Sequence, residues 1–329
     1  MNLSRRRTGG TIALVAAFVL LVSACSGGGK PKTDESSSGG GGGNSGYKFA
    51  MITHETPGDT FWDRIKAGAQ QAAKDTGSTL KYSADPDATK QAVLIQNAID
   101  SKVDGIATTL VTPDALIPNV KKAVAAGIPV DSFNSGLGFY KQAGAITHFS
   151  SDEFLAGQQA GQKAKAGGAK KVLCVIQQTG SVALEDRCKG VKNTFPNTVN
   201  IQVNGADDSA VTSALQAKLT QDKSINWVIT LGAAQALDTI KVIPAAGSSA
   251  KVGTFDLNIE AAQAVKDGTL QFAIDQQPYL QGYLAITQLY LFKLNGNIMG
   301  GGGPVLTGPS FVDKTNVDAV LPFIQKNTR

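Results

Sequence analysis

Residues 47–77 read YKFAMITHETPGDTFWDRIKAGAQQAAKDTG, and they contain the unit from which the rest of the chain is built. The segment 47–53 is rich in aromatic and β-branched residues, which predicts a strand. Apolar residues then recur at helical spacing, namely at Phe61, Ile65, Ala69 and Ala72. Gly77 is typical of a helix end. The unit is therefore a strand, a loop and an amphipathic helix.

The same strand–helix unit recurs roughly every 25 to 30 residues along the chain. Such alternation is typical of parallel sheets covered by helices on both faces and wound right-handedly. Nine or ten units are more than one open sheet comfortably holds, so we predict an α/β fold with two lobes. The predicted strands are 47–53, 80–83, 105–109, 128–133, 171–176, 201–203, 227–230, 251–255 and 271–274.

The first residues have the pattern of an export signal. Three arginines at 5–7 precede an apolar run at 11–22, and two small residues precede Cys25. The run is too short to cross a bilayer as a mature helix, so we predict a signal peptide at 1–24. The small residues before Cys25 indicate a lipoprotein with lipid on this cysteine. An ordinary signal with an unrelated cysteine is the alternative, and the general and twin-arginine export routes both stay open.

Residues 25–46 form a predicted tether between the lipid and the folded body. After Cys25 the segment is built almost wholly of Gly and Ser, and its two basic and two acidic residues cancel. Such a segment cannot bury apolar surface and behaves as a flexible coil with a reach of about 25 Å. We therefore expect a protein that is anchored on the extracytoplasmic face of the cell membrane.

The formal net charge of +5 does not indicate a nucleic-acid-binding protein. The chain has 31 Lys and Arg against 26 Asp and Glu, but three of the arginines belong to the predicted signal peptide. Without residues 1–24, 28 basic residues face 26 acidic ones, a net charge of +2. We therefore predict no nucleic-acid partner. With 42% hydrophobic and 17% charged residues, the chain is also too apolar to be disordered throughout.

The loops that follow the predicted strands carry aromatic and polar residues. Ligands of open parallel sheets bind at this edge. Aromatic rings stack on the C–H faces of sugars, and planar polar groups hydrogen-bond to vicinal hydroxyls, so we predict a site for a neutral polyhydroxyl ring. Taken singly, Phe61 and Trp62 also suit a helix-start core, and each Asp also suits a helix cap. The candidates are Asp59, Phe61, Trp62, Asn134, Arg187, Asp256 and Gln276.

Several short motifs occur in a set order along 47–329. They are YKFAMI at 47–52, FW at 61–62 with GAQ at 68–70, DGI at 104–106, GIPV at 127–130, SD at 151–152 with AG at 156–157, Arg187 before Gly190, GTFD at 253–256 and DQQP at 275–278. Together they resemble the ribose-type periplasmic binding proteins, the solute receptors of ABC sugar importers. The resemblance implies two Rossmann-like lobes that close on a monosaccharide, with three hinge crossings near Ser150, Gln277 and Leu306.

The resemblance also implies the domain limits and the partners. It places 47–150 and about 278–306 in the first lobe, and 151–277 and about 307–329 in the second. It implies a monomer that hands a sugar or polyol to an ABC permease and its ATPase. A receptor that signals to a chemoreceptor or kinase uses the same clamp and is the alternative. A sugar-responsive repressor shares this fold, but the export signal and the lack of a helix-turn-helix segment before the first strand argue against it.

Roles in the candidate site follow from the same resemblance. Phe61 and Trp62 would sandwich the ring from the first lobe. Three further residues would bind its hydroxyl groups, namely Arg187, Asp256 and Gln276. Asp59 stands where the ribose-type proteins have Asn, and Asn134 stands where they usually have Asp.

Two positions depart from the family pattern. Ser135 stands where ribose binders carry an Arg, and Gly232 stands where they carry an Asn in the second lobe. The loss of these two donors argues against ribose itself as the ligand. The loop at 53–60 also looks longer than usual, so further polar side chains are expected near the ligand. The second-rank candidates are His54, Glu55, Asp207 and Asp208.

Two cysteines remain once Cys25 is assigned to lipid. Cys174 lies in a predicted strand and Cys188 in the following helix, an even pair in an oxidising compartment. A disulfide between them would fasten the Arg187 segment to the sheet. Two buried free thiols are the alternative, because a bridge must also satisfy the Cα separation.

Motifs for catalysis and for cofactor binding are lacking. The chain has no G-x-G-x-x-G between a strand and a helix, no phosphate loop and no G-x-S-x-G elbow. With only His54 and His148 it has no cluster for a metal, and we expect His148 to be structural at the first hinge. We therefore predict a binding protein without cofactor or metal, and not an enzyme. A glycosidase that uses a carboxylate pair is the less favoured alternative.

Overall fold

The computed structural model describes residues 45–329. The predicted signal peptide, the lipidation site Cys25 and the tether up to residue 44 lie outside the described residues. Among the helices of residues 45–329, none combines the length and the apolar character needed to cross a membrane.

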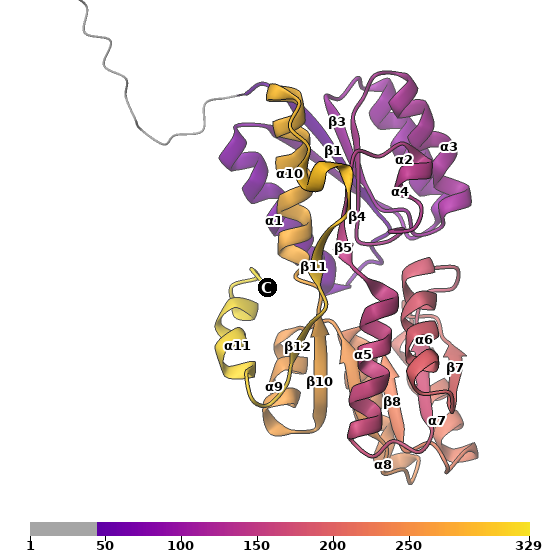
Figure 1. The fold of residues 1–329 in the computed structure, drawn as a ribbon. Coiled ribbons are helices and arrows are strands. Elements are labelled where there is room, and N and C mark those ends of the chain that lie inside the picture. Colours follow the sequence, from indigo (N-terminus) through magenta and orange to yellow (C-terminus); the bar gives the residue numbers. More distant parts are fainter. Residues whose placement is uncertain (1–44) are drawn as a thin grey trace, which may run out of the picture. The chain divides into compact units, whose positions relative to one another are not determined.

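Strands from the described residues form two six-stranded sheets (Figure 1). The first sheet has the order β11-β5-β4-β3-β1-β2, and its pairs are parallel. Its strands are β1 (Lys48–Thr53), β2 (Thr79–Ala84), β3 (Gly105–Thr108), β4 (Val130–Phe133), β5 (His148–Ser151) and β11 (Val305–Gly308). The inner strands β3 and β4 are buried along their whole length, because helices cover both faces of the sheet.

The second sheet repeats this arrangement with the order β12-β10-β9-β8-β6-β7. Only the edge strand β12 is antiparallel to its neighbour β10. The strands are β6 (Val172–Ile176), β7 (Thr198–Gln202), β8 (Trp227–Thr230), β9 (Lys251–Phe255), β10 (Leu270–Asp275) and β12 (Ser310–Val312). The prediction of an α/β fold with two largely parallel sheets is confirmed.

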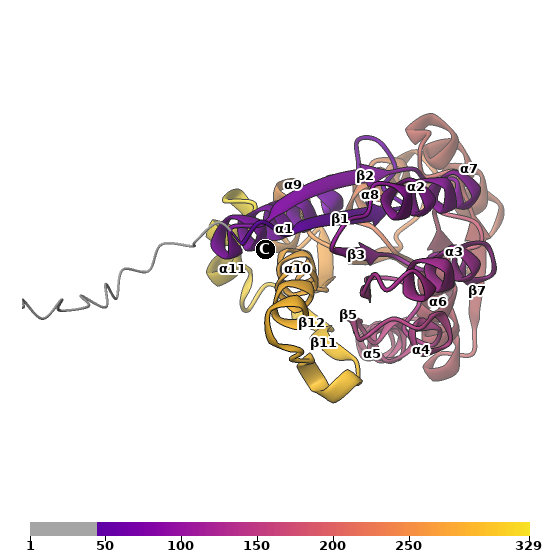
Figure 2. The ribbon, with the colours of Figure 1, turned by 90° about the horizontal axis from the view of Figure 1, so that it is seen from above.

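Helices cover both faces of the first sheet, as Figure 2 shows from above. On one face α1 (Thr60–Thr76) and α10 (Pro278–Asn295) bury Phe49, Met51 and Phe133. On the other face lie α2 (Ala88–Asp100), α3 (Pro113–Ala125) and α4 (Tyr140–Ala143). A short 3₁₀-helix, η1 (Met299–Gly302), precedes β11.

The second sheet is covered in the same way. The helices α5 (Glu153–Ala166) and α6 (Val182–Thr194) pack on one face. The other face is covered by α7 (Asp208–Gln221), α8 (Ala233–Ala245), α9 (Ile259–Asp267) and α11 (Val317–Gln325). Each sheet therefore separates two apolar layers, and its strand ends are left for polar residues.

Glycines allow one helix pair on each sheet to pack with close backbones. A Cβ on Gly68 of α1 would lie 2.0 Å from the carbonyl oxygen of Tyr279 in α10. On the second sheet, a Cβ on Gly157 of α5 would lie 2.0 Å from the carbonyl oxygen of Arg187 in α6. Any larger residue would force these helices apart. Each contact involves a helix that carries candidate site residues, namely α1 and α6.

Three strands that we did not predict lie where the chain passes between the sheets. β5 has the sequence HFSS, which gives no alternating pattern although all four residues are buried. β11 and β12 are separated only by Pro309, so one extended segment joins both sheets. The other two connections run from β5 to α5 and from β10 to α10. β7 begins three residues earlier than predicted, at Thr198.

The last residues after α11 link the second sheet to α1. Nε of Arg64 in α1 donates a 2.6 Å hydrogen bond to the carbonyl oxygen of Arg329. The Arg329 guanidinium in turn lies 2.7 Å from Oδ2 of Asp275 at the end of β10. These contacts hold the start of α1 close to the carboxyl end of the second sheet.

Candidate ligand-binding site

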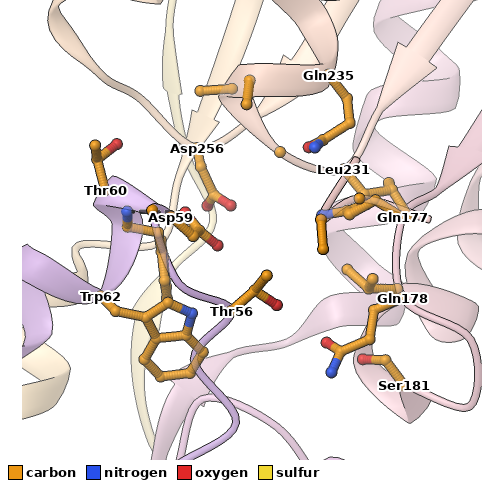
Figure 3. Close-up of a pocket in the computed structure, with 18 of the residues that line it drawn as sticks. Thr56, Asp59, Thr60, Trp62, Gln177, Gln178, Ser181, Leu231, Gln235 and Asp256 are labelled. Atoms are coloured by element: carbon orange, nitrogen blue, oxygen red, sulfur yellow. Dashed lines mark hydrogen bonds between the residues drawn. The ribbon is translucent and has the colours of Figure 1, made fainter. Parts of the chain in front are cut away.

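A cavity of about 630 Å³ lies at the carboxyl ends of strands from both sheets (Figure 3). Loops after β1 and β4 line it from the first sheet, and loops after β6, β7, β8, β9 and β10 line it from the second. This size is typical of a small-molecule site. The residues selected from the sequence that line it are His54, Asp59, Phe61, Trp62, Asn134, Arg187, Asp207, Asp208, Asp256 and Gln276.

The first turn of α1 positions the aromatic pair. Asp59 is the N-cap, because its Oδ1 accepts a 3.0 Å hydrogen bond from the backbone N–H of Phe61. The rings of Phe61 and Trp62 meet edge to face at 5.3 Å, and His54 meets Trp62 in the same way at 4.7 Å. Both aromatic residues line the cavity and also belong to the core under α10. Phe61 and Trp62 are therefore both part of the hydrophobic core and part of the cavity wall.

Three residues beyond strand ends adopt the left-handed backbone conformation. The φ angles are +62° at Asn134, +66° at Asp256 and +55° at Gln277. This conformation is uncommon for residues other than glycine and costs on the order of 1–3 kcal/mol at each position. It turns the chain sharply after β4, β9 and β10. Asn134 and Asp256 thereby line the cavity instead of continuing their sheets.

Arg187 is buried and held on three sides. Its Nε lies 2.6 Å from Oε2 of Glu153, and Nη1 donates a 3.0 Å hydrogen bond to the carbonyl oxygen of Leu231. The guanidinium also lies 4.5 Å from the centre of the Phe255 ring. Burial alone would lower the pKa of Arg187, but the carboxylates of Glu153 and Asp256 raise it above its ordinary value. Arg187 is therefore a fixed cation at the cavity wall.

Asp256 lines the same cavity and interacts electrostatically with Arg187. Burial raises the pKa of its carboxyl group to about 7, although Arg187 and a hydrogen bond from Gln276 act in the opposite direction. Figure 3 shows Asp59, from the first sheet, and Asp256, from the second, pointing into the same space. The carboxyl group of Asp256 can therefore accept or donate a hydrogen bond near neutral pH.

His54 is a neutral side chain of the cavity wall. Burial, together with the positive charge of Arg187, lowers its pKa to about 3. Its Nδ1 shares a 2.8 Å hydrogen bond with Oγ1 of Thr109. It therefore offers the cavity an edge that carries no charge at physiological pH.

Two other second-rank candidates occupy less central positions. Glu55 does not line the cavity, because its carboxylate lies 2.6 Å from Nζ of Lys66 and accepts a hydrogen bond from Tyr82. Asp207 lines the cavity and also caps α7, accepting a 3.0 Å hydrogen bond from the N–H of Ala210. Asp207 is thus both a helix N-cap, the alternative role considered for each single Asp, and a residue of the cavity wall.

Several lining residues were missed by our reasoning from the sequence. They are the polar residues Gln177, Gln178, Ser181, Gln235 and Asn258. Gln177 and Gln178 directly follow β6, so their position after a strand could have identified them. The structure explains why Gly232 is not an Asn. A Cβ at this position would lie only 2.5 Å from Oε1 of Gln235 and 3.0 Å from Nε2 of Gln177. Ser135, by contrast, is buried outside the cavity wall.

Cys174 of β6 and Cys188 of α6 form a disulfide with a Cα separation of 5.9 Å. Cys188 follows Arg187 directly, so the bridge fastens the Arg187 segment to the second sheet. His148 lies away from the cavity and is fully buried, sharing a 2.7 Å hydrogen bond with Ser132. Within residues 45–329, no group of three or more His, Cys, Asp or Glu is placed to hold a metal ion.

The chain is similar to known transport proteins over most of its length. Residues 49–296 match the periplasmic binding protein domain. A solved structure of a carbohydrate transporter from Acidothermus cellulolyticus 11B, in complex with myo-inositol, is 53% identical to this chain with a TM-score of 0.85. The alignment covers 86% of this chain and all of that one.

More distant relatives are sugar-binding proteins of prokaryotes. The xylose/arabinose-binding protein of Sulfolobus acidocaldarius is 25% identical over 296 residues, which are 84% of this chain and 73% of that protein. The ribose import binding protein of Bacillus subtilis is 26% identical over 251 residues, which are 74% of this chain and 81% of that protein. All three relatives are named as binding or transport proteins.

Proposed function

The chain belongs to the periplasmic binding protein domain family, and from this premise we propose that it binds a neutral polyhydroxylated ring outside the cytoplasm and delivers it to an ABC importer. The observation that carries the proposal is the cavity at the strand ends of two sheets. It combines aromatic rings with carboxyl, carboxamide and guanidinium groups, the set that recognises C–H faces and vicinal hydroxyls. The relatives in this family are sugar-binding transport proteins and not enzymes.

Within this class, myo-inositol is the first ligand to test. The relative solved with myo-inositol is 53% identical, far above the ribose import protein at 26%. The positions of Ser135 and Gly232 also argue against ribose. Titration calorimetry and thermal unfolding with myo-inositol, hexoses and pentoses test the proposal. A ligand present at 100 times its dissociation constant adds about 2.7 kcal/mol of stability. If no neutral ring binds or stabilises the protein at millimolar concentration, the proposed function is wrong.

The proposed mechanism is closure of two lobes around the ring. Each lobe is one sheet with its helices, and the residue limits of the lobes are those predicted from the sequence. The three connections between the sheets act as the hinge. A ring that contacts both lobes binds the closed form more tightly and shifts the population towards it. A 3.2 Å hydrogen bond from the backbone N–H of Val182, at the start of α6, to the carbonyl oxygen of Val111, in the loop after β3, already links the two lobes. Small-angle scattering should show a smaller radius of gyration with ligand than without it.

The proposed anchor is a lipid on Cys25, and the proposed partners are the permease and ATPase that accept the ligand from the closed monomer. The motif before Cys25 and the Gly/Ser segment after it support the anchor. In cells that express the full chain, a Cys25→Ala variant should be released from the membrane fraction. Equal retention of this variant and the wild-type protein would exclude the lipid anchor.

A further inference from the structure

Within the part of the chain that the structure describes, the only ion pair with both side chains buried joins Arg187, in the cavity wall, to Glu153, which the sequence did not indicate as a site residue. Glu153 opens α5, and its side chain reaches Arg187 from behind the cavity, with 6% of the carboxylate side chain exposed. Glu153 itself does not line the cavity. Its Oε2 lies 2.6 Å from Nε of Arg187, while Oε1 has no hydrogen-bond partner in residues 45–329. Arg187 is therefore the ion-pair partner of Glu153, and its positive charge opposes the effect of burial, which raises the pKa of Glu153.

Arg187 is the only cationic side chain among the described residues that line the cavity. The ionisable lining residues are His54, Asp59, Arg187, Asp207, Asp208 and Asp256. His54 is neutral, and the other four are carboxyl groups. Burial raises the pKa of Asp59 as well as that of Asp256, which weakens the negative charge that these two groups set against Arg187.

We propose that Glu153 sets the charge selectivity of the site, an inference that rests on the proposed function. Glu153 neutralises Arg187 from behind, so the guanidinium acts as a hydrogen-bond donor to hydroxyl groups. The cavity consequently rejects rings that carry carboxylate or phosphate. The geometry supports this division of roles. Glu153 takes the Nε edge of the guanidinium and Leu231 takes one Nη1 proton, while Nη2 makes no hydrogen bond with any described residue and Arg187 lines the cavity. An unpaired arginine in the same place would be a strong receptor for an anion.

The wild-type protein gives the first test, with two matched pairs of probes in calorimetry. Myo-inositol is compared with myo-inositol 1-phosphate, and D-glucose with D-glucuronate. The charged member of a pair should bind at least about 100-fold more weakly, because like charges brought together are strongly unfavourable. Equal affinity for the two members of a pair would overturn the proposal.

Glu153→Gln separates the charge from the shape, since glutamine keeps a carbonyl acceptor near Arg187. We expect the preference for the neutral member to fall by about tenfold or more, because the cation is no longer balanced. If Glu153 had a merely structural role, the variant would bind both members of a pair more weakly by the same factor. An unchanged ratio of the two affinities would therefore contradict the proposal. The matched control is Glu260→Gln, which removes an exposed carboxylate on α9 outside the cavity wall and should leave the ratio as in the wild type.

Inorganic phosphate provides a readout that needs no ring ligand. In thermal unfolding, phosphate should leave the wild-type protein unaffected, stabilise Glu153→Gln in a saturable way, and lose this effect in Glu153→Gln with Arg187→Gln. A folded Glu153→Gln that ignores phosphate overturns the proposal. If Glu153→Gln does not fold, the wild-type comparisons decide. If no ring binds the wild type, the proposed function fails, while the phosphate experiment still tests the role of Glu153.

Discussion

The side-chain amide of Gln276 donates a hydrogen bond of 2.5 Å to Oδ1 of Asp256. The two residues follow the neighbouring strands β10 and β9, so the contact ties two loops of the cavity wall together. Burial nevertheless raises the pKa of Asp256 to about 7, so its ionised form is disfavoured in the unliganded protein. The charge of this carboxylate therefore opposes folding.

This relationship predicts a pH-dependent gain in stability for Asp256→Asn. Between the unfolded pKa near 4 and the folded pKa near 7, the folded state holds a proton that the unfolded state has lost, so this group's contribution to stability falls as pH rises. Asparagine removes that loss. The melting temperature of the variant relative to the wild type should therefore rise between pH 5 and pH 8, by the equivalent of at most about 3 kcal/mol. The same variant should bind the ring ligand more weakly at both values.

Thermal unfolding of both proteins at the two pH values measures this effect. Taking the difference from the wild type cancels the opposite trend of His54 and His148, whose lowered pKa values make the fold less stable as pH falls below their ordinary range. A difference that is constant with pH, or that shrinks as pH rises, would contradict the assignment.

Trp62 should report ligand binding through its fluorescence. The chain has two tryptophans, and Trp227 is buried in the core of the second sheet, away from the cavity. In a Trp227→Phe variant the emission comes from Trp62 alone, and a ring stacked against it should change that emission in a saturable way. Trp62→Leu should weaken binding by roughly 10- to 100-fold, as expected from the loss of an aromatic contact. Unchanged emission at saturating ligand, established by calorimetry, would place the ring elsewhere.

The disulfide should contribute to stability and leave no free thiols. In a Cys25→Ala background, unfolded and unreduced protein should contain no reactive thiol, since Cys174 and Cys188 are bridged. Replacing both cysteines by alanine should lower the free energy of unfolding by about 3 kcal/mol, the value expected for a closed loop of about 15 residues. Two reactive thiols per chain would show that the bridge does not form.

Local patterns in the sequence predicted nine of the twelve strands in the described residues and ten of the residues that line the cavity, because in parallel sheets the order of strands and loops places strand-end residues at one edge. They did not predict β5, whose four residues HFSS are buried without any alternation, nor the short strands β11 and β12. They also missed Glu153, which lies 34 positions before Arg187. That contact depends on how α5 and α6 pack, which no local pattern encodes. Glu55 shows the reverse case, since it is near the site in sequence but is held outside by Lys66 and Tyr82.

The contact between α5 and α6 predicts that Gly157→Ala alters both stability and binding. The new Cβ would lie 2.0 Å from the carbonyl oxygen of Arg187, so α6 must move away and carry the guanidinium with it. We expect a loss of about 1–3 kcal/mol in the free energy of unfolding, typical of overpacking. Gly138→Ala is the matched control, because no atom lies within 4 Å of its Cβ position and its φ is not positive.

Gly68→Ala should destabilise to a similar extent through α10 without moving Arg187. Chemical denaturation together with calorimetry separates the cases, and a Gly157→Ala variant that binds the ring as tightly as Gly138→Ala would show that the position of Arg187 does not depend on this contact.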